Sequence, residues 1–120
     1  MFSKFKNKKT EYNGVKFDSK LELNIYKEII ALGLQVELQP KFELQEKFRL
    51  NGKSYRPIQY VGDFKLIVND VEYIIDAKGM ETQVFKIKSK MFAYKFKKEI
   101  VKIKSLKQFK EWLEKIGGNE

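Results

Sequence analysis

The 120-residue chain contains neither cysteine nor histidine. The absence of cysteine excludes a disulfide framework and a thiolate metal site. The absence of histidine excludes imidazole bases, Ser-His triads and His-ligated zinc. Any metal ion bound by the chain must therefore be held by oxygen atoms, which favours Mg²⁺, Mn²⁺ or Ca²⁺.

Long apolar runs are also missing from the sequence. The chain has no stretch of roughly 18 apolar residues, so no transmembrane helix and no membrane contact are predicted. The opening segment, MFSKFKNKKTEYNG, lacks the apolar centre of a signal peptide. We therefore expect a cytoplasmic protein.

Arginine is scarce in a strongly basic chain. The formal net charge is +9, and of the 25 basic residues only Arg49 and Arg56 are arginines. A small basic domain of this kind usually binds nucleic acid, although a lysine-rich composition can also serve solubility alone. Because arginine is the usual bidentate reader of guanine, the lysine excess predicts phosphate contacts rather than base-by-base recognition.

The turn signals and apolar periodicity predict one domain over residues 1–120, of α/β (α+β) class, with 1–9 as a loose basic arm. Pairs of turn-forming residues at 13–14, 51–52 and 69–70 predict three two-residue hairpin turns. Residues 34–50, LQVELQPKFELQEKFRL, alternate apolar and polar positions and predict two extended segments interrupted by Pro40.

Three helices are predicted from capping signals. The first covers about 20–32, with Ser19 as its N-cap and Gly33 as its C-cap. The second covers about 81–96 and is followed by a short strand, EIVKIKS. The last begins after Ser105 and ends at Gly117.

Two aspartates interrupt the apolar pattern of the hairpin DFKLIVNDVEYIIDAKG, residues 63–79. If residues 69–70 form a two-residue turn, Asp63 lies directly opposite Asp76, and Lys78 projects from the same face. The opposite face is apolar and consists of Phe64, Leu66, Val68, Tyr73, Ile75 and Ala77. Facing like charges destabilise a sheet, so either a divalent cation compensates them or the acids and Lys78 form an exposed surface cluster.

Glu22 is a third candidate carboxylate. On a helical wheel it falls within the stripe predicted to be buried, which contains Ile25, Tyr26, Ile29, Ile30 and Leu32. A carboxylate that faces inward needs a partner. Two roles fit this position: closing a capping box with Ser19, or pointing over the sheet toward Asp63, Asp76 and Lys78.

Glu22 on a first helix, Asp63 on one strand and Asp76-Ala77-Lys78 on the next resemble the PD-(D/E)XK nuclease superfamily, with Gly62 in place of the motif's Pro. The predicted element order is similar to the αβββαβ core of that superfamily, with an added N-terminal hairpin and C-terminal helix. The resemblance therefore implies a restriction-endonuclease-like core, in which a mixed sheet is flanked by helices. Nearly the whole chain also resembles a small phage-encoded family of uncharacterised proteins, through the segments KNKKTEYNGVKFDSKLE, LQPKFEL and DF…DAKG.

This resemblance implies an Mg²⁺- or Mn²⁺-dependent DNA endonuclease that acts on branched or recombination intermediates, as Holliday-junction resolvases do. Asp63, Asp76 and the carbonyl of Ala77 would hold the metal, Glu22 would complete or orient that shell, and Lys78 would position the attacking water. Two symmetric nicks would require a homodimer, and a phage protein would work in the bacterial host cytoplasm. The alternative is a non-catalytic nucleic-acid-binding accessory protein of recombination or replication with the same fold.

Further residues are candidates for contacts with DNA phosphates. Lysines in the second helix recur at helical spacing, which indicates either a phosphate track beside the site or a solvated face. Trp112 is expected to pack in the core. The predicted nucleic-acid contacts are Gln39, Arg49, Arg56, Gln83, Lys86, Lys90, Tyr94 and Lys97.

Overall fold

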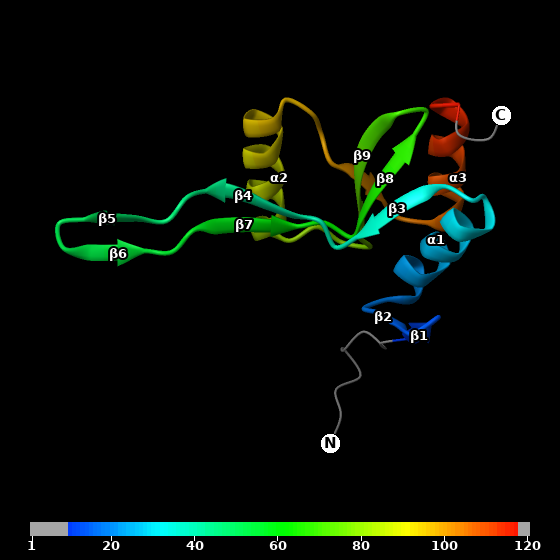
Figure 1. The fold of residues 1–120 in the computed structure, drawn as a ribbon, viewed down its shortest axis with the longest axis horizontal. Coiled ribbons are helices and arrows are strands. Elements are labelled where there is room, and N and C mark those ends of the chain that lie inside the picture. The colour runs from blue at the N-terminus through cyan, green and yellow to red at the C-terminus, as the bar shows by residue number, and fades with distance from the viewer. Residues whose placement is uncertain (1–9, 118–120) are drawn as a thin grey trace, which may run out of the picture.

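The computed structural model describes residues 10–117, so the basic arm predicted at 1–9 lies outside the described residues. The strands are β1 (Thr10–Tyr12), β2 (Val15–Phe17), β3 (Gln35–Leu38), β4 (Lys41–Gln45), β5 (Phe48–Leu50), β6 (Lys53–Tyr55), β7 (Ile58–Val61), β8 (Phe64–Val68), β9 (Val71–Ala77) and β10 (Val101–Ile103). The helices are α1 (Lys20–Ala31), α2 (Gln83–Phe96) and α3 (Leu106–Lys115). The protein therefore mixes α and β elements, as predicted (Figure 1).

The largest sheet of the described part has four strands in the order β10-β9-β8-β3. The β3–β8 and β8–β9 pairs are antiparallel, whereas β9 and β10 are parallel, so the sheet is mixed. Three two-stranded ladders, β1-β2, β4-β7 and β5-β6, complete the strand pairing. No helix within residues 10–117 is long and apolar enough to cross a membrane.

All three predicted hairpin turns are confirmed. They join β1 to β2, β5 to β6 and β8 to β9. Every central residue of the turns has a positive φ, from 50° at Asn51 to 78° at Gly14. Two successive positive φ values match the right-handed twist of antiparallel strands, which is why Asn, Asp and Gly occupy these positions.

The helix caps also follow the sequence signals. The Ser19 and Ser105 hydroxyls each accept a backbone N–H three residues ahead, at 3.1 Å. The helix predicted from 81 begins instead at Gln83, because the Thr82 hydroxyl accepts the N–H of Phe85 and acts as its N-cap. Gly33, predicted as the C-cap of α1, follows the observed cap Leu32 with a φ of +69°.

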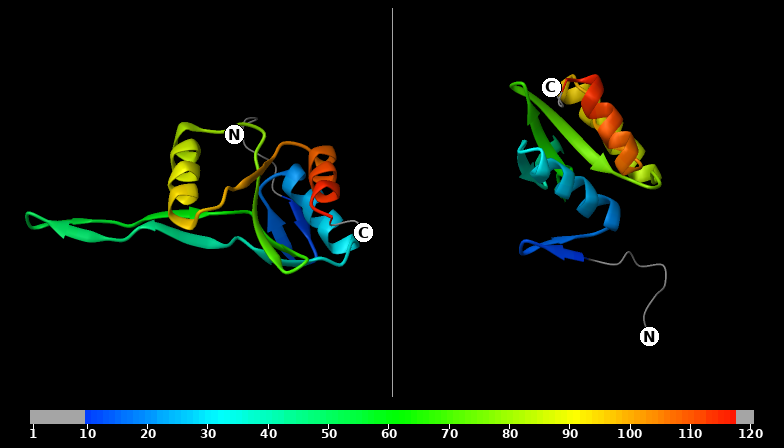
Figure 2. Two further views of the ribbon diagram at one scale, coloured as in Figure 1. Left: turned by 90° about the horizontal axis from the view of Figure 1, so that it is seen from above. Right: turned by 90° about the vertical axis from the view of Figure 1, so that its right-hand side faces the viewer.

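Helices α1 and α3 cover one face of the four-stranded sheet and form the first core (Figure 2). The predicted apolar face of β8 and β9 lies here: Phe64, Leu66 and Ile75 are completely buried. Trp112 packs against this core as predicted, with its ring 5.0 Å from that of Tyr73.

Two residues of the predicted apolar stripe of α1 are not buried. Ile30 is 42% exposed and Leu32 is 39% exposed. Ile30 lies at the edge of the stripe, and Leu32 lies beyond the last helical residue, so the sheet covers neither of them. The buried part of the stripe is narrower and centres on Ile25 and Ile29.

Helix α2 packs on the opposite side of β9 and forms a second core. Its Phe85 and Phe92 join Ile74 of β9 and Tyr60 of β7 in one buried cluster. The face that carries Asp76 is the less apolar one, as predicted. Its central part is nevertheless not exposed, because α2 and β7 bury Ile74 and Asp76.

A two-stranded ribbon, Lys41–Val61, projects from the body beyond α2 (Figures 1 and 2). It consists of the β4-β7 ladder followed by the β5-β6 ladder. Residues 34–50 thus form three strands rather than the predicted two, because the chain breaks its pairing between β4 and β5. Without the ribbon, the elements from α1 onward run α1, β3, β8, β9, α2, β10 and α3.

Candidate functional site

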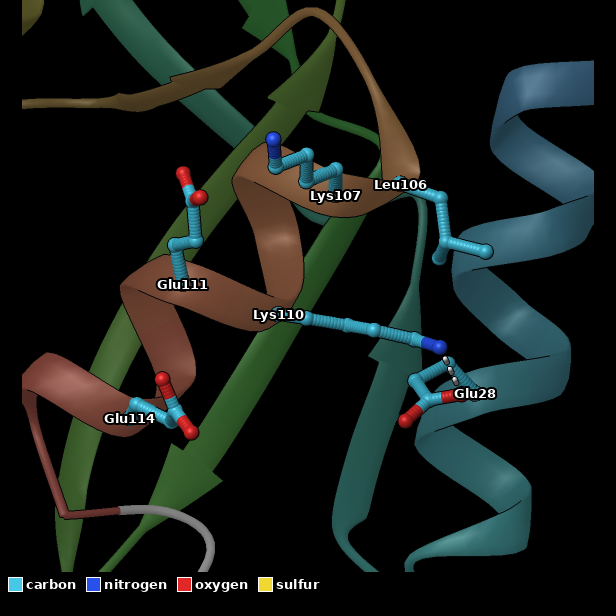
Figure 3. Close-up of a pocket in the computed structure, with 6 residues that line it drawn as sticks. All are labelled: Glu28, Leu106, Lys107, Lys110, Glu111 and Glu114. Carbon is cyan, nitrogen blue, oxygen red and sulfur yellow. Dashed lines mark ion pairs between the residues drawn. The ribbon is translucent and has the colours of Figure 1, made fainter.

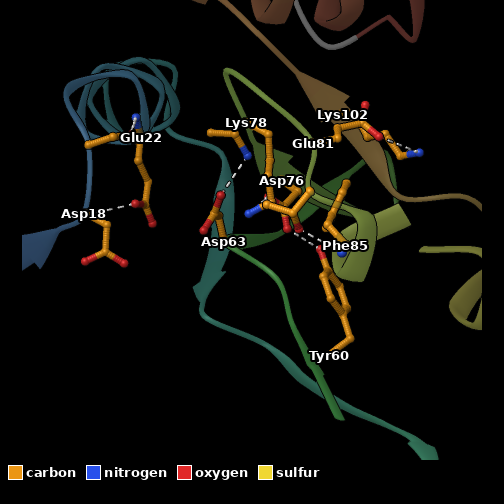
Figure 4. Close-up of polar contacts among 12 residues, drawn as sticks. Asp18, Glu22, Tyr60, Asp63, Asp76, Lys78, Glu81, Phe85 and Lys102 are labelled. Atoms are coloured by element: carbon orange, nitrogen blue, oxygen red, sulfur yellow. Dashed lines mark hydrogen bonds and ion pairs between the residues drawn. The ribbon is translucent and has the colours of Figure 1, made fainter. Parts of the chain in front are cut away.

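A pocket of about 790 Å³ lies where α1, the start of β8 and the end of β9 meet. Its walls bring together Glu22, Asp63, Ala77 and Lys78, four of the residues predicted for catalysis or metal binding. Asp18, Ser19, Leu21, Gly79, Met80 and Lys104 complete the lining. Figure 4 shows the acidic side chains arranged in sequence from α1 toward β9, with Asp63 in the middle.

Asp63 lies just beyond the end of the β8-β9 ladder. The predicted register holds from the turn to the Phe64–Ile75 pair, where the ladder ends. Asp63 was predicted to pair with Asp76 in this ladder, but the ladder ends one residue before that pair. Its backbone N–H donates to the Ile75 carbonyl at 3.1 Å, and its Oδ2 accepts the N–H of Ala77 at 2.7 Å. This side-chain bond replaces the next rung of the ladder and turns the carboxyl toward the pocket.

Asp76 is only 1% exposed, which is unusual for an aspartate. Its Oδ2 accepts the Tyr60 hydroxyl at 2.6 Å, and its Oδ1 lies 3.1 Å from Lys78 Nζ. That second oxygen accepts no hydrogen bond from the described residues, so the two charges are close without a well-aligned hydrogen bond. Lys78 Nζ also lies 4.9 Å from the centre of the Phe85 ring, which fixes the ammonium at the pocket edge.

Glu22 is buried at 6% exposure, as the helical wheel predicts. Its Oε1 accepts the N–H of Asp18 at 3.2 Å, while its own N–H donates to the Ser19 hydroxyl. The capping box is therefore present in a modified form, since the Glu22 carboxyl accepts the backbone N–H of Asp18 rather than that of Ser19. Glu22 combines the two predicted roles, because it caps the helix and faces the pocket.

The acidic groups of the pocket oppose one another's ionisation. Burial, together with the charges of Asp76 and Glu22, raises the pKa of Asp63 from 3.8 to about 8, because the Ala77 N–H and Lys78 oppose this rise only in part. Burial also raises the pKa of Glu22, although hydrogen bonds with the Asp18 N–H and the Asp63 side chain lower it in part; the charges of Asp18 and Asp76 add to the rise. Burial and the charge of Asp76 raise the pKa of Tyr60 well above its usual 10.0. The pocket thus carries more negative potential than Lys78 compensates.

No three acidic side chains within residues 10–117 are grouped closely enough to hold a metal ion together. The predicted convergence of Glu22, Asp63 and Asp76 on one ion is therefore not found. Two of these acids have other hydrogen-bond partners. Glu22 Oε1 accepts the Asp18 N–H, although the Glu22 side chain also interacts with that of Asp63, and Asp76 Oδ2 accepts the Tyr60 hydroxyl.

Gly62 directly precedes Asp63. Its N–H donates to the Pro40 carbonyl at 2.9 Å, a bond that a proline could not make. A Cβ at this position would lie 3.1 Å from Ile74 Cγ2 and 3.2 Å from the Tyr60 hydroxyl. A larger residue here would therefore require Ile74 or Tyr60 to shift by a few tenths of an ångström.

The predicted lysines of α2 form a row that continues from the pocket. Lys86 and Lys90 are exposed and line a neighbouring pocket of about 440 Å³ together with Lys102. Lys102 Nζ lies 5.6 Å from the Phe85 ring, which Lys78 also contacts, so the ring lies between the two groups. Basic side chains thus continue from Lys78 along α2, although Glu81 pairs with Lys102 at 3.7 Å and Glu99 lines the same pocket as the lysines.

The remaining predicted contacts lie in three places. Gln39 lines a pocket of about 320 Å³ with Glu22 and Asp63, so it lies at the site. Gln83, Tyr94 and Lys97 are exposed on α2 or at its C-cap, and Lys97 Nζ lies 4.5 Å above the Tyr94 ring. Arg49 and Arg56 lie on the projecting ribbon and do not line the pocket.

Two residues of the site were missed by the sequence analysis. Asp18 lines the pocket, and its position next to the N-cap Ser19 was the available signal. Tyr60 binds Asp76 across 16 positions of sequence, and no local pattern signals that contact because it depends on the ribbon folding back.

Another pocket, of about 560 Å³, lies between α1 and α3 (Figure 3). It is lined by Glu28, Leu106, Lys107, Lys110, Glu111 and Glu114. Its one ion pair, Lys110 with Glu28, is 3.9 Å long, and its other charged groups are exposed on α3. It contains no buried polar group and has no feature of a reactive site.

Replacing Asp63 with asparagine is expected to flatten the pH dependence of stability of the metal-free protein. Between pH 3.8 and about 8, the folded state holds a proton on Asp63 that the unfolded state releases. This group therefore lowers the free energy of unfolding as pH rises through that window. Thermal unfolding in EDTA at pH 5 and pH 9 should show a larger loss for wild type than for Asp63→Asn; equal losses would contradict the assigned environment.

A search of curated proteins and a search of solved structures each returned no match to this chain. One family model, described as "Protein of unknown function (DUF1064)", matches residues 2–110. That match includes every residue of the pocket, the whole ribbon and helix α2. The chain therefore belongs to the DUF1064 family.

Proposed function

We propose that the protein is a divalent-metal-dependent endonuclease that hydrolyses phosphodiester bonds in DNA. The observation that carries this proposal is the buried carboxylate of Asp76, whose Oδ1 has no hydrogen bond and lies 3.1 Å from Lys78 Nζ. A buried charge is costly unless it is paired and hydrogen-bonded. A cation bound by this oxygen and by the Asp63 carboxyl would offset the free-energy cost of burying the Asp76 charge.

The donor set fits a hard cation such as Mg²⁺ or Mn²⁺. Magnesium usually keeps several waters and is bound by one or two carboxylates together with substrate phosphate. Asp63 and Asp76 would supply those carboxylates, with the carbonyl of Ala77 as a further ligand. Glu22, whose side chain interacts with that of Asp63, would complete this shell through a bound water. A cation would also relieve the repulsion that raises the pKa of Asp63.

When bound, the cation would supply positive charge at the scissile phosphate and lower the pKa of a nearby water. Lys78 would orient the attacking water and donate a hydrogen bond to a phosphate oxygen as negative charge develops. Glu22 would accept a hydrogen bond from the same water. Tyr60 would hold Asp76 in one orientation through its 2.6 Å hydrogen bond.

The surroundings of the site support DNA as the substrate. The lysines of α2 lie beside the pocket, where they could follow a phosphate backbone, and the chain has a net charge of +9. The order α1, β3, β8, β9, α2, β10 supports a restriction-endonuclease-like core with the ribbon as an insertion. We extend the proposal to branched recombination intermediates, to a homodimer that makes paired nicks, and to action in a bacterial host cytoplasm.

The second candidate is a nucleic-acid-binding accessory protein that lacks turnover. The specific observation in its favour is that residues 10–117 contain no group of three acids suited to a metal ion. In that case the Asp76–Lys78 ion pair would be a structural element, and DNA binding through the lysines of α2 would be the whole function.

A nicking assay separates the two candidates. Supercoiled plasmid and a four-way junction are incubated with wild type, Lys78→Met or Lys107→Met in Mg²⁺, Mn²⁺, Ca²⁺ or EDTA. We expect wild-type cleavage with Mg²⁺ or Mn²⁺ only. Lys78→Met keeps the aliphatic chain over Phe85 but removes the ammonium, so its rate should fall roughly 100-fold or more. Lys107→Met, on the solvated surface of α3, should cleave as wild type does. Absence of wild-type cleavage with every substrate and metal would refute the enzyme and leave the accessory protein.

A further inference from the structure

The end of the ribbon, Glu46–Arg56, is exposed at every position and is here called the ribbon tip. Helix α2 and the second core cover only the β4-β7 part of the ribbon. A two-stranded hairpin in water is marginally stable by itself, and nothing in the described part of the chain covers this one. Its sequence nevertheless forms a regular three-pair ladder with a type I′ turn. A well-formed hairpin that buries nothing in its own protein indicates a surface for a partner.

The charge of the ribbon tip favours a polyanion as that partner. It carries four basic side chains and one acidic side chain, Glu46. Arg49 and Arg56 are the only arginines among the 25 basic residues of the chain, and both are here. Arginine is better suited than lysine to bidentate contacts with phosphate and guanine. Elsewhere in the chain lysine supplies the positive charge, so the arginines are concentrated on the element that stands apart from the body.

The two faces of the ribbon tip have different chemistry. One face carries the stacked rings of Phe48 and Tyr55, with centroids 4.6 Å apart, and Leu50. Lys53, the ladder partner of Leu50, lies on the same face with its Nζ 5.2 Å from the centre of the Tyr55 ring. On the other face, Arg49 donates to the Ser54 hydroxyl at 2.8 Å and to the Gly52 carbonyl at 3.2 Å. These bonds use two of the five guanidinium N–H donors and hold the group in place, which leaves the other three for a ligand.

A groove of duplex DNA matches this shape. The major groove of B-DNA admits a two-stranded β-ribbon, and its walls offer phosphates, guanine acceptors and thymine methyl groups. Those are suitable partners for lysine, arginine and an apolar face respectively. The major groove of A-form RNA is too deep and narrow for side chains to read, so the ribbon favours DNA over double-stranded RNA.

The ribbon is joined directly to the candidate site. Strand β7 ends at Val61, and only Gly62 separates it from Asp63. From Val61 to Leu50 at the tip, about eleven residues at ~3.3 Å each span roughly 36 Å. One helical turn of B-DNA measures about 34 Å. A duplex bound at the site and followed by the ribbon would thus meet the tip about one turn away.

We propose that the ribbon tip inserts into the major groove of duplex DNA about one helical turn from the candidate site. The position relative to a cut bond rests on the proposed function, but the binding itself does not require cleavage. The substrate must then include a duplex arm of at least about 11 base pairs on one side of the site. Shorter duplexes lack the segment that the tip contacts.

The test measures binding without turnover, by fluorescence anisotropy in EDTA, with labelled DNA duplexes of 10 and 30 base pairs. In the main variant, residues 48–50 and 53–55 are deleted, so that Asn51-Gly52 joins Lys47 to Arg56 and the two-residue turn is kept. Affinity of this variant for the 30-base-pair duplex should fall about tenfold or more, which corresponds to ~1.4 kcal/mol. Its affinity for the 10-base-pair duplex should change less than about twofold.

A point variant tests the same contact in case the shortened ribbon misfolds. Arg49→Gln should weaken binding to the long duplex about 3- to 10-fold and reduce its salt dependence, whereas the charge-matched Lys107→Gln should not. Unchanged affinity of both ribbon variants would overturn the proposal. Equal, tip-dependent binding of a 30-base-pair RNA duplex would also overturn it. The same holds if the deletion changes only the molecular mass of the protein in sedimentation, because the tip would then serve self-association. If no substrate is cleaved but DNA binding depends on the tip, the proposed nuclease fails and this inference stands.

Discussion

Asp76→Asn is expected to reduce metal-dependent DNA cleavage by at least roughly 10²–10³-fold while the protein stays folded. The substitution keeps the size of the side chain and removes its charge. The asparagine carbonyl can still accept the Tyr60 hydroxyl, so the buried hydrogen bond survives. A cation, however, would lose one of its two carboxylate ligands, and Lys78 would lose its ion-pair partner.

The same substitution should not lower stability in the absence of metal. The charge of Asp76 raises the pKa values of both Asp63 and Glu22, so its removal relieves repulsion within the pocket. We expect a melting temperature in EDTA that equals or exceeds that of wild type. Lost activity with retained stability is typical of residues whose arrangement serves function at a cost to the fold.

A matched control is available at the other end of the same hairpin. Asp70→Asn removes one acidic charge from the exposed β8-β9 turn, where asparagine tolerates the φ of 68°. Cleavage of supercoiled plasmid and thermal unfolding are measured for wild type and both variants. Full activity of Asp76→Asn would refute its assignment to the reaction, and a collapse of its melting temperature would show that the carboxylate is structural.

Phe92→Ala is expected to cost about 3–5 kcal/mol of unfolding free energy. Phe92 is completely buried at the centre of the second core, with ring centroids 5.0 Å from Phe42, 5.7 Å from Tyr60 and 4.8 Å from Phe96. Its removal would leave a cavity between α2 and the root of the ribbon. Since small domains have roughly 5–15 kcal/mol of stability, a large part of the total would be lost.

The control for this prediction is the same substitution on the ribbon tip. Phe48 is 40% exposed and packs only against Tyr55 across the ladder, so Phe48→Ala should cost less than about 1 kcal/mol. Urea titrations monitored by circular dichroism give both values. Similar costs for the two variants would contradict the division of the ribbon into a buried root and an exposed tip.

Local signals predicted much of this structure from the sequence. The three two-residue turns and the serine caps depend on residues within four positions of one another, and each was predicted correctly. The register of the β8-β9 hairpin followed from its turn. The burial of Glu22 followed from helical periodicity, which does not depend on distant contacts.

The parts that were not predicted depend on distant contacts. Alternating residues at 34–61 predict strands but not that four of them continue as one ribbon, because pairing between distant segments leaves no local pattern. Tyr60 reaches Asp76 only through that pairing. The ladder ends one residue before Asp63 because the Asp63 carboxyl, rather than its backbone, accepts the Ala77 N–H. Local sequence does not signal this side-chain hydrogen bond. Periodicity likewise could not show that α2 would bury Asp76.

The parallel pairing of β9 with β10 also determines when the site can form during synthesis. The backbone N–H of Lys78 is held by the carbonyl of Ile103, and Asp76 is paired with Lys102 in the same ladder. A nascent chain that has not yet emerged beyond β10 therefore lacks the strand that fixes both residues. Helix α1, which carries Glu22, is made earlier, but it packs on strands of the same sheet, and a domain generally folds as a unit. We expect the pocket to acquire its final geometry only when the last strand has left the ribosome.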